Sequence, residues 1–254
     1  TIIISDNIIK SIENGYKEVS DDNIKIYDLK SKVVLPGLID FHVHMESQSG
    51  GQDRYIKRFQ DNKADIAFKS SVIAKKTLMA GFTTVRDVGG SGVNISLRNA
   101  INNGVVPGPR IFTSGKTIAT TGGHGDRTNG YRDDLVDDPG PEQGVVNSIA
   151  DARKAVRYRY KNGADLIKIT ATGGVMSLAK NGQNPQFTEE VIREIVKTAD
   201  DYGMHVAAHA HGDEGMFRAV NAGVTTIEHG SIMAERTMKL MKEKQTYLVP
   251  TISA

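Results

Sequence analysis

The chain has 254 residues, no cysteine, and 32 Lys plus Arg against 30 Asp plus Glu, which leaves a formal charge of +2. Because both signs are scattered and no basic run stands out, we expect no nucleic-acid partner. No apolar stretch approaches the ~18 residues of a membrane span, so we expect no membrane partner. The N-terminus lacks a signal-peptide pattern, which makes the cytoplasm the default location and leaves a processed, exported form as the alternative. Without cysteine, a metal site must use His, Lys, Asp or Glu.

The first 34 residues predict part of a small β domain, with strands at residues 2–4 and 25–29 separated by polar, turn-rich stretches. After Pro36-Gly37 the pattern changes to strands that alternate with helices, which indicates a parallel sheet. We therefore predict a partial, sandwich-like β domain over residues 1–35 and a second domain over residues 36–254.

One local sequence pattern recurs four times in the second domain: a helix ends in a small or polar residue plus glycine, and an apolar strand follows. The glycines are Gly81, Gly163, Gly203 and Gly223, and each is predicted to take the left-handed conformation after its helix. One helix face carries Val191, Ile192, Ile195, Val196 and Ala199, with Thr188 as its N-cap. Strands are predicted near residues 38–44, 83–87, 110–114, 166–170, 205–210, 225–229 and 247–250.

Seven consecutive βα-type strands predict an α/β fold of TIM type, a (β/α)8 barrel that stops here after about strand seven. Polar residues end several of these strands, and the active site of a barrel gathers at that face. A doubly wound sheet also binds ligands at C-terminal strand ends, but its site clusters at one topological switch rather than drawing residues from strands one, four, five and six. The barrel is therefore favoured.

Two histidines one residue apart, His42 and His44, end the apolar strand Leu35-Pro-Gly-Leu-Ile-Asp-Phe-His-Val-His44. Strand side chains alternate between faces, so these two imidazoles point the same way and can chelate one metal ion. His209 and His229 stand at equivalent ends of two later strands. Four imidazoles on one rim are more than hydrogen bonding requires, and imidazole is a preferred neutral ligand of zinc and similar ions.

Lys168 is the second chemical signal, because Ile flanks it on both sides within a predicted strand. Burial lowers the pKa of an amine and makes it nucleophilic. The competing interpretation is a lysine at the strand end that reaches solvent or a carboxylate. A neutral amine beside metal ions can instead add carbon dioxide and become a carbamate, whose two oxygens can bridge two cations.

Six motifs in fixed order carry a family resemblance. They are Pro36-Gly-Leu-Ile-Asp-Phe-His-Val-His44, Gly81-Phe-Thr-Thr-Val-Arg-Asp87, Thr121-Gly-Gly-His-Gly-Asp126, Gly163-Ala-Asp-Leu-Ile-Lys168, Ala207-Ala-His-Ala-His-Gly212 and Thr226-Ile-Glu-His-Gly230. With these motifs the chain resembles members of the amidohydrolase superfamily, and it is similar to metal-dependent Xaa-Pro dipeptidases (prolidase-like) and acyl-amino-acid carboxypeptidases.

The resemblance implies two divalent metal ions of the zinc type, about 3.5–4 Å apart. It assigns one ion to His42 and His44, the other to His209 and His229, and a carboxylated Lys168 between them. A hydroxide bridging the ions would then cleave the amide bond of a small dipeptide or N-acyl amino acid. We also expect a homo-oligomer.

Two further histidines receive roles from the same resemblance. His124, in a glycine-rich loop, is expected to contact the substrate carbonyl or the oxyanion and is our catalytic candidate. His211 follows His209 by two residues and is expected, with His124, to bind substrate, holding its α-carboxylate. Asp87 is a candidate for orienting a metal ligand, with helix capping or a salt bridge as equal alternatives.

The sequence departs from the family at one point, because the family pattern requires an aspartate at the end of strand eight as metal ligand and proton shuttle. The chain stops at Val249-Pro-Thr-Ile-Ser-Ala254, by strand seven. A barrel without its last strand would leave two unpaired edges, so we expect the chain to be part of a longer polypeptide.

Three alternatives remain. A cyclic-amide hydrolase or deaminase of the same superfamily, such as an imidazolonepropionase, usually has an acid three residues after the fifth-strand histidine and no bridging lysine, whereas this chain has Gly212 and Lys168. A nucleotide or phosphate binder is suggested by Gly89-Gly-Ser-Gly92, but the third glycine of a dinucleotide fingerprint would fall at Ile95. A non-catalytic metal-binding barrel would bind metal without turnover.

Overall fold

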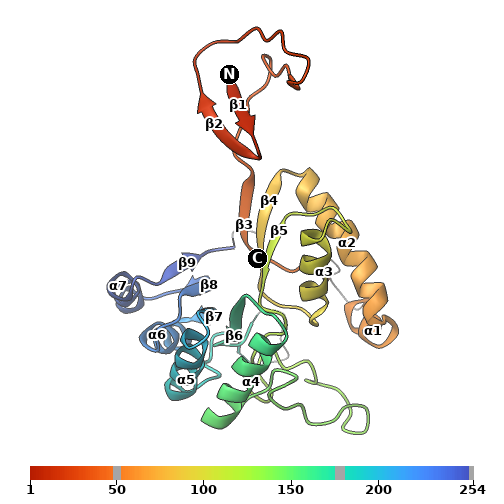
Figure 1. Cartoon of the computed structure of the whole chain (residues 1–254). Coiled ribbons are helices and arrows are strands. Elements are labelled where there is room, and N and C mark those ends of the chain that lie inside the picture. Colours follow the sequence, from red (N-terminus) through yellow and green to blue (C-terminus); the bar gives the residue numbers. More distant parts are fainter. Residues whose placement is uncertain (48–52, 175–180, 252–254) are drawn as a thin grey trace. The chain divides into compact units, whose positions relative to one another are not determined.

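The computed structural model describes residues 1–47, 53–174 and 181–251 and divides into two compact units, Thr1–Pro36 and Gly37–Ala254. In the first unit, strands β1 (Ile2–Ser5) and β2 (Ile8–Ile12) pair as an antiparallel hairpin (Figure 1). Its two turn residues, Asp6 and Asn7, have φ angles of 54° and 62°. Two positive φ angles are what a tight hairpin turn requires, and Asp and Asn tolerate them well.

The sequence-based placement of strands in this unit is wrong in one case. Residues 25–29 form no strand and have no ladder partner among the described residues. The second strand is Ile8–Ile12 instead, and the sequence analysis missed it. Sequence distance explains the difference, because the Asp-Asn turn lets the neighbouring segment pair at once, at a smaller loop-closure cost than a segment some twenty residues away.

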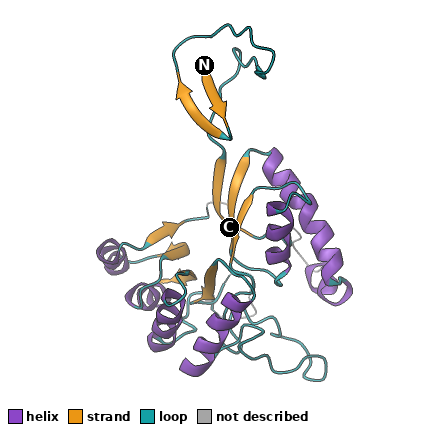
Figure 2. Ribbon diagram, in the orientation of Figure 1, coloured by secondary structure: helices purple, strands orange, loops and turns teal. Residues whose placement is uncertain are grey.

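The second unit alternates strands and helices throughout (Figure 2). Its strands are β3 (Leu38–Val43), β4 (Phe82–Asp87), β5 (Arg110–Thr113), β6 (Leu166–Thr170), β7 (His205–Gly212), β8 (Thr226–Ile232) and β9 (Tyr247–Val249). Its helices are α1 (Asp53–Gln60), α2 (Lys63–Met79), α3 (Val93–Asn102), α4 (Ile149–Lys161), α5 (Glu189–Asp200), α6 (Asp213–Asn221) and α7 (Glu235–Lys244). Among the described residues, no helix is both long and apolar enough to cross a lipid bilayer.

All strand pairs in this unit are parallel, and they form two sheets in the orders β3-β4-β5 and β6-β7-β8-β9. The loop after β5 joins the sheets, because Ile118 bridges to Ile169 in β6. Within the described part of the chain, β3 and β9 each pair with one strand only. The predicted α/β class is therefore confirmed as a partial TIM barrel, with each predicted strand of this unit at its expected place.

The predicted pattern of a helix, a glycine and a following strand is also confirmed. Gly81, Gly163, Gly203 and Gly223 all have positive φ angles, between 65° and 98°. Helix α5 begins after Thr188 and buries Ile192, Ile195 and Ala199, as its spacing predicts. The Thr188 side chain makes no capping hydrogen bond, so the residue contributes its extended backbone only.

Strand alternation separates the hydrophobic core from the barrel interior. In β6, Ile167 and Ile169 belong to a large apolar cluster that also includes Ile192 and Ile195 of α5. Since alternate residues point to opposite faces, Lys168 between them points into the barrel. The helices α4 to α7 lie along the strands β6 to β9 (Figure 1) and shield this core from water.

Ile195→Ala is expected to lower the free energy of unfolding by about 2–5 kcal/mol, because the side chain is fully buried and its loss leaves a cavity. Urea denaturation monitored by circular dichroism measures this change. Ile56→Ala in α1, where the side chain is 54% exposed, is the matched control and should change the free energy of unfolding by less than about 1 kcal/mol. Equal effects of the two substitutions would contradict the assignment of the core.

Candidate metal centre

The structure brings the histidines of four separate stretches of sequence together. The imidazole rings of His42 and His44 lie 5.3 Å apart between centroids, and His42 lies 4.8 Å from His229. His229 in turn lies 4.7 Å from His209 and 4.9 Å from His211. His124 stacks on His209 at 4.4 Å. All six histidines that the sequence analysis singled out therefore form one cluster, which we call the imidazole cluster.

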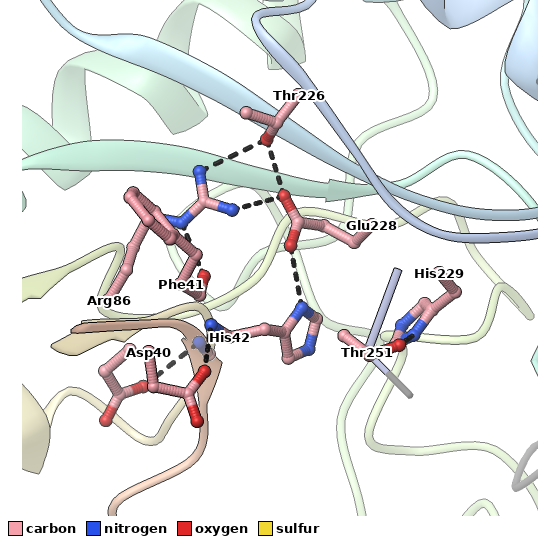
Figure 3. Close-up of polar contacts among 10 residues, drawn as sticks. Asp40, Phe41, His42, Arg86, Thr226, Glu228, His229 and Thr251 are labelled. Carbon is pink, nitrogen blue, oxygen red and sulfur yellow. Dashed lines mark hydrogen bonds and ion pairs between the residues drawn. The ribbon is translucent and has the colours of Figure 1, made fainter. Parts of the chain in front are cut away.

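His42 in β3 and His44, directly after β3, are held by different partners. His42 Nδ1 donates to Glu228 Oε2 at 2.8 Å (Figure 3). His44 Nδ1 donates to the carbonyl oxygen of Gly89 at 3.0 Å. A hydrogen bond to one ring nitrogen fixes the tautomer, so a metal at this place would bind the other nitrogen, here Nε2.

His209 and His211 lie at the end of β7 and share one face of that strand. His209 is buried, and its Nε2 donates to the carbonyl oxygen of Gly173 at 2.9 Å, so a metal at this place would bind Nδ1. His211 Nδ1 forms a hydrogen bond of 2.9 Å with the hydroxyl of Ser231. One ring nitrogen from each of His209, His211 and His229 lies within 4.8 Å of the others, a spacing that suits one metal ion. The sequence-based expectation gives His211 to the substrate and leaves His209 and His229 for the metal, and it stays a prediction.

His229 reaches the cluster through an unusual backbone conformation. Alternation along β8 sends Thr226 and Glu228 to one face and Ile227, which packs in the core, to the other. His229 should follow Ile227, but its φ angle of 73° turns its side chain back toward the imidazoles. Its Nδ1 shares a 2.7 Å hydrogen bond with the Thr251 hydroxyl.

Lys168 lies inside the barrel and is only 4% exposed. Burial lowers the pKa of its amine to about 8, although the nearby Glu228 carboxylate opposes this shift. Within the described part of the chain its amine makes no hydrogen bond or ion pair. The same charge acts on the pKa of His42, His209, His211 and His229, which places the amine among the imidazoles.

His124 is positioned by the loop that carries it. Its backbone N–H donates to Gln186 Oε1 at 2.8 Å. The nearby carboxylate of Asp126 accepts from the N–H groups of Gly122 and Thr128, which fixes the turn. A side chain at Gly174 would place its Cβ 2.4 Å from the His124 ring, so glycine at that position allows the ring to pack there.

Glu228 and Arg86 form a buried ion pair beside the cluster that the sequence analysis did not predict. Arg86 Nη2 donates to Glu228 Oε1 at 2.5 Å, and the Thr226 hydroxyl donates to the same oxygen (Figure 3). Burial opposes ionisation, but the hydrogen bond from His42 and the charges of Lys168 and Arg86 lower the pKa of Glu228 to about 2. The sequence offered one signal for this pair. Glu228 follows Thr226 by two residues in a predicted strand, so both side chains point to the same face, and a carboxylate that is buried in a strand needs a cationic partner.

Asp87 acts on a cluster histidine only indirectly. Its carboxylate accepts from the backbone N–H groups of Met45 and Gly89, and Gly89 carries the carbonyl that accepts from His44. Asn94 donates to it as well. Burial raises the pKa of Asp87 to about 7 despite these donors. Of the expected roles, support of a histidine through the backbone fits these contacts.

The glycine-rich segment after β4 is occupied by an acid of the chain itself. The carboxylate of Glu46 accepts from the backbone N–H groups of Ser91 and Asn94, at 2.6 and 2.8 Å. A side chain at Gly90 would place its Cβ 2.4 Å from Glu46 Oε1. The N-terminus of α3 is therefore satisfied by Glu46, and the segment offers no cradle for a phosphate.

Burial favours the neutral form of four imidazoles of the cluster, those of His42, His209, His211 and His229. It lowers the pKa of His42 and His211, lowers that of His229 to about 3, and lowers that of His209 well below its usual value; for the last two, the Lys168 charge is the next cause. Neutral imidazole is the form that ligates metals. These four rings thus present lone pairs rather than charges at neutral pH.

Without metal, the protein is expected to lose stability as the pH falls below about 6.5, the usual pKa of an unfolded histidine. Below that pH, His209 binds a proton in the unfolded chain but stays unprotonated in the folded chain. Each such group lowers the free energy of unfolding by up to about 1.4 kcal/mol per pH unit. His209→Asn should reduce this slope by about one proton. Urea denaturation of the metal-free protein between pH 5 and 7 measures it, and an unchanged slope would contradict the neutral, buried state of His209.

Comparisons with known proteins agree with this geometry. Residues 33–254 match the amidohydrolase family. The chain is 53% identical to a Xaa-Pro dipeptidase whose crystal structure has methionine bound in the active site; the TM-score is 0.93, and the match covers 99% of this chain and 62% of that one. It is 38% identical, with a TM-score of 0.82, to a prolidase complexed with N-methylphosphonate-L-proline, over 92% of this chain and 57% of that one.

A third relative is ochratoxinase of Aspergillus niger, which is 34% identical over 236 residues. That match covers 87% of this chain and 48% of ochratoxinase, so the chain spans about half the length of this relative. The match to the family extends from the end of the first unit through every strand that contributes to the imidazole cluster. The chain belongs to the amidohydrolase family.

Proposed function

We propose that the protein is a metal-dependent hydrolase that cleaves the amide bond of dipeptides or N-acyl amino acids, with proline or a related residue on the C-terminal side. The observation that carries this proposal is the imidazole cluster gathered around the buried amine of Lys168. A cluster of neutral nitrogen donors serves neither packing nor charge pairing, whereas it serves divalent cations well.

The donor set fits two divalent cations such as zinc. His42 and His44 would present Nε2 to one ion, because their Nδ1 atoms donate to Glu228 and Gly89. His209 would present Nδ1 to the other ion, and His229 would present Nε2, opposite the nitrogen bonded to Thr251. Each of these ring orientations is fixed before any metal binds, which favours binding.

Lys168 would link the two sites as a carbamate. Its amine lies among the imidazoles without a hydrogen-bond partner in the described chain, and its lowered pKa increases the share of neutral amine that can add carbon dioxide. The added group would carry two oxygens and one negative charge. That charge would offset part of the positive charge that two cations bring into a buried site.

When bound, the cations would supply a hydroxide nucleophile and polarise the amide carbonyl. His124 would donate a hydrogen bond to the oxygen of the tetrahedral species, because its ring is stacked at the edge of the cluster on a fixed loop. His211, partly exposed and hydrogen-bonded to Ser231, would hold the α-carboxylate of the substrate. The aspartate that the family pattern places on strand eight would transfer the proton to the leaving amine.

The substrate class is supported by what the similar proteins bind. Methionine and N-methylphosphonate-L-proline both present a free α-carboxylate. The second carries tetrahedral phosphorus on the proline nitrogen, where the amide carbon of an Xaa-Pro dipeptide would stand. Both features fit a small substrate that ends in a free carboxylate and is attacked at the bond to its last residue.

Lys168→Ala in the protein at its full natural length is expected to lower kcat/KM at least 10³-fold, because the two metal sites lose the group that joins them. Hydrolysis of a panel of Xaa-Pro dipeptides and N-acyl amino acids measures this, together with metal content per chain. Lys239→Ala, at an exposed position of α7, is the matched control and should keep full activity.

Hydrolysis that survives both chelation and Lys168→Ala would contradict the two-metal proposal. Bound metal without turnover of any substrate in the panel would favour a non-catalytic barrel. Turnover restricted to cyclic amides would favour the imidazolonepropionase-like alternative.

His211→Asn is expected to raise KM for an Xaa-Pro dipeptide about 10–100-fold with a smaller change in kcat, because a hydrogen bond to a charged group is lost in substrate binding. The C-terminal amide of the same dipeptide lacks the carboxylate, so its kcat/KM should be nearly the same in the parent and the variant. A change of equal size for the acid and the amide would contradict a carboxylate-binding role.

A further inference from the structure

The buried ion pair between Glu228 and Arg86 does more than neutralise two charges. Glu228 is fully buried and uses both carboxylate oxygens, Oε2 for His42 Nδ1 and Oε1 for Arg86 and Thr226. An ionised carboxylate can only accept hydrogen bonds. Nδ1 of His42 must therefore carry the proton of this hydrogen bond, which leaves Nε2 as the nitrogen on the far side of the ring.

Arg86 fixes this arrangement from three directions. Its Nε donates to the carbonyl oxygen of Phe41, the residue before His42, at 2.7 Å. Its Nη1 donates to the Thr226 hydroxyl at 3.2 Å and its Nη2 to Glu228. Arg86 in β4 thus ties the backbone of β3 to the side chains of β8, two strands that do not pair with each other in the described sheets.

The far edge of the His42 ring, opposite Nδ1, is turned toward His229 (Figure 3). Glu228 and His229 are adjacent in sequence; strand alternation sends the Glu228 side chain inward, and the positive φ angle of His229 turns its side chain to the same side. Two adjacent residues of β8 therefore have different tasks: His229 contributes an imidazole to the cluster, and Glu228 accepts the hydrogen bond that orients His42 of β3. A carboxylate behind a histidine ligand both sets its orientation and raises its basicity.

We propose that Glu228, held by Arg86, is a positioning residue that keeps His42 in the Nδ1–H tautomer with Nε2 facing the imidazole cluster, and thereby sets the metal affinity of the site. This inference rests on the proposed metal-dependent function. It goes beyond that function in assigning control of metal affinity to an acid that does not itself contact the metal.

Glu228→Gln tests the tautomer directly. Arg86 would keep the amide oxygen, so the amide NH2 would face His42 Nδ1 and force the proton onto Nε2. We expect the ¹⁵N chemical shifts of the His42 ring in the metal-free protein to reverse, and the affinity for Co²⁺ or Zn²⁺ to fall about 10–100-fold in competition with a chromophoric chelator. An unchanged tautomer and unchanged affinity would overturn the inference.

A double variant separates positioning from charge pairing. Glu228→Leu with Arg86→Met removes both charges and keeps similar volume, so the stability of the metal-free protein should stay near that of the parent. If Glu228 acts through His42, metal affinity nevertheless stays at least ~10-fold low. If Glu228 only neutralises Arg86, the double variant regains the parent affinity, which would overturn the inference.

The control is the surface pair of Arg153 and Glu194, changed in the same way by Glu194→Leu with Arg153→Met, which should leave metal affinity unchanged. All measurements use the protein at its full natural length. A parent protein that binds no Co²⁺ or Zn²⁺ at all would overturn the proposed function, whereas a parent that binds metal with Glu228 variants that bind equally well would overturn this inference alone. The tautomer measurement on Glu228→Gln decides the question even if the double variant does not fold.

Discussion

The parallel register of the strands is the constraint on which the candidate metal centre depends. Because the C-terminal strand ends meet at one rim, side chains from distant stretches of sequence are brought together there, and the loop between β5 and α4 adds His124. Thr170 lies opposite His209, and His209 lies opposite Glu228, so neighbouring strands deliver their polar residues in one row. A shift of one residue in any strand would send its imidazole into the apolar layer under the helices.

The barrel interior also has an unusual charge balance. Lys168 and Arg86 bring two cationic side chains into the buried space, and the one carboxylate of Glu228 forms an ion pair with Arg86. Burial favours the neutral form of His209 and His229, so these two rings add no charge. An interior that already carries excess positive charge would accept further cations only together with anionic ligands, which is consistent with a carbamate on Lys168 and a carboxylate from elsewhere in the polypeptide.

Much of the second unit could be predicted from sequence, because its determinants are local. Glycine after a helix and the spacing of Ile192, Ile195 and Ala199 each fix one element on their own. The prediction of a strand at residues 25–29 failed because a strand also needs a pairing partner. The Asp6-Asn7 turn brings Ile8–Ile12 beside β1, so this segment pairs with β1 instead. The Glu228–Arg86 pair was missed for a related reason, since the two residues lie 142 positions apart and meet only through the folded barrel.

His229 illustrates how a binding site and a stable fold can make opposite demands on one residue. A left-handed backbone conformation costs a non-glycine residue roughly 1–2 kcal/mol, although histidine is among the side chains that adopt it more readily. Glycine would remove that cost and the imidazole together. Selection for thermal stability alone would therefore replace histidine at this position. If histidine is retained in a laboratory evolution experiment, the retention reports on the placement of a ligand rather than on folding.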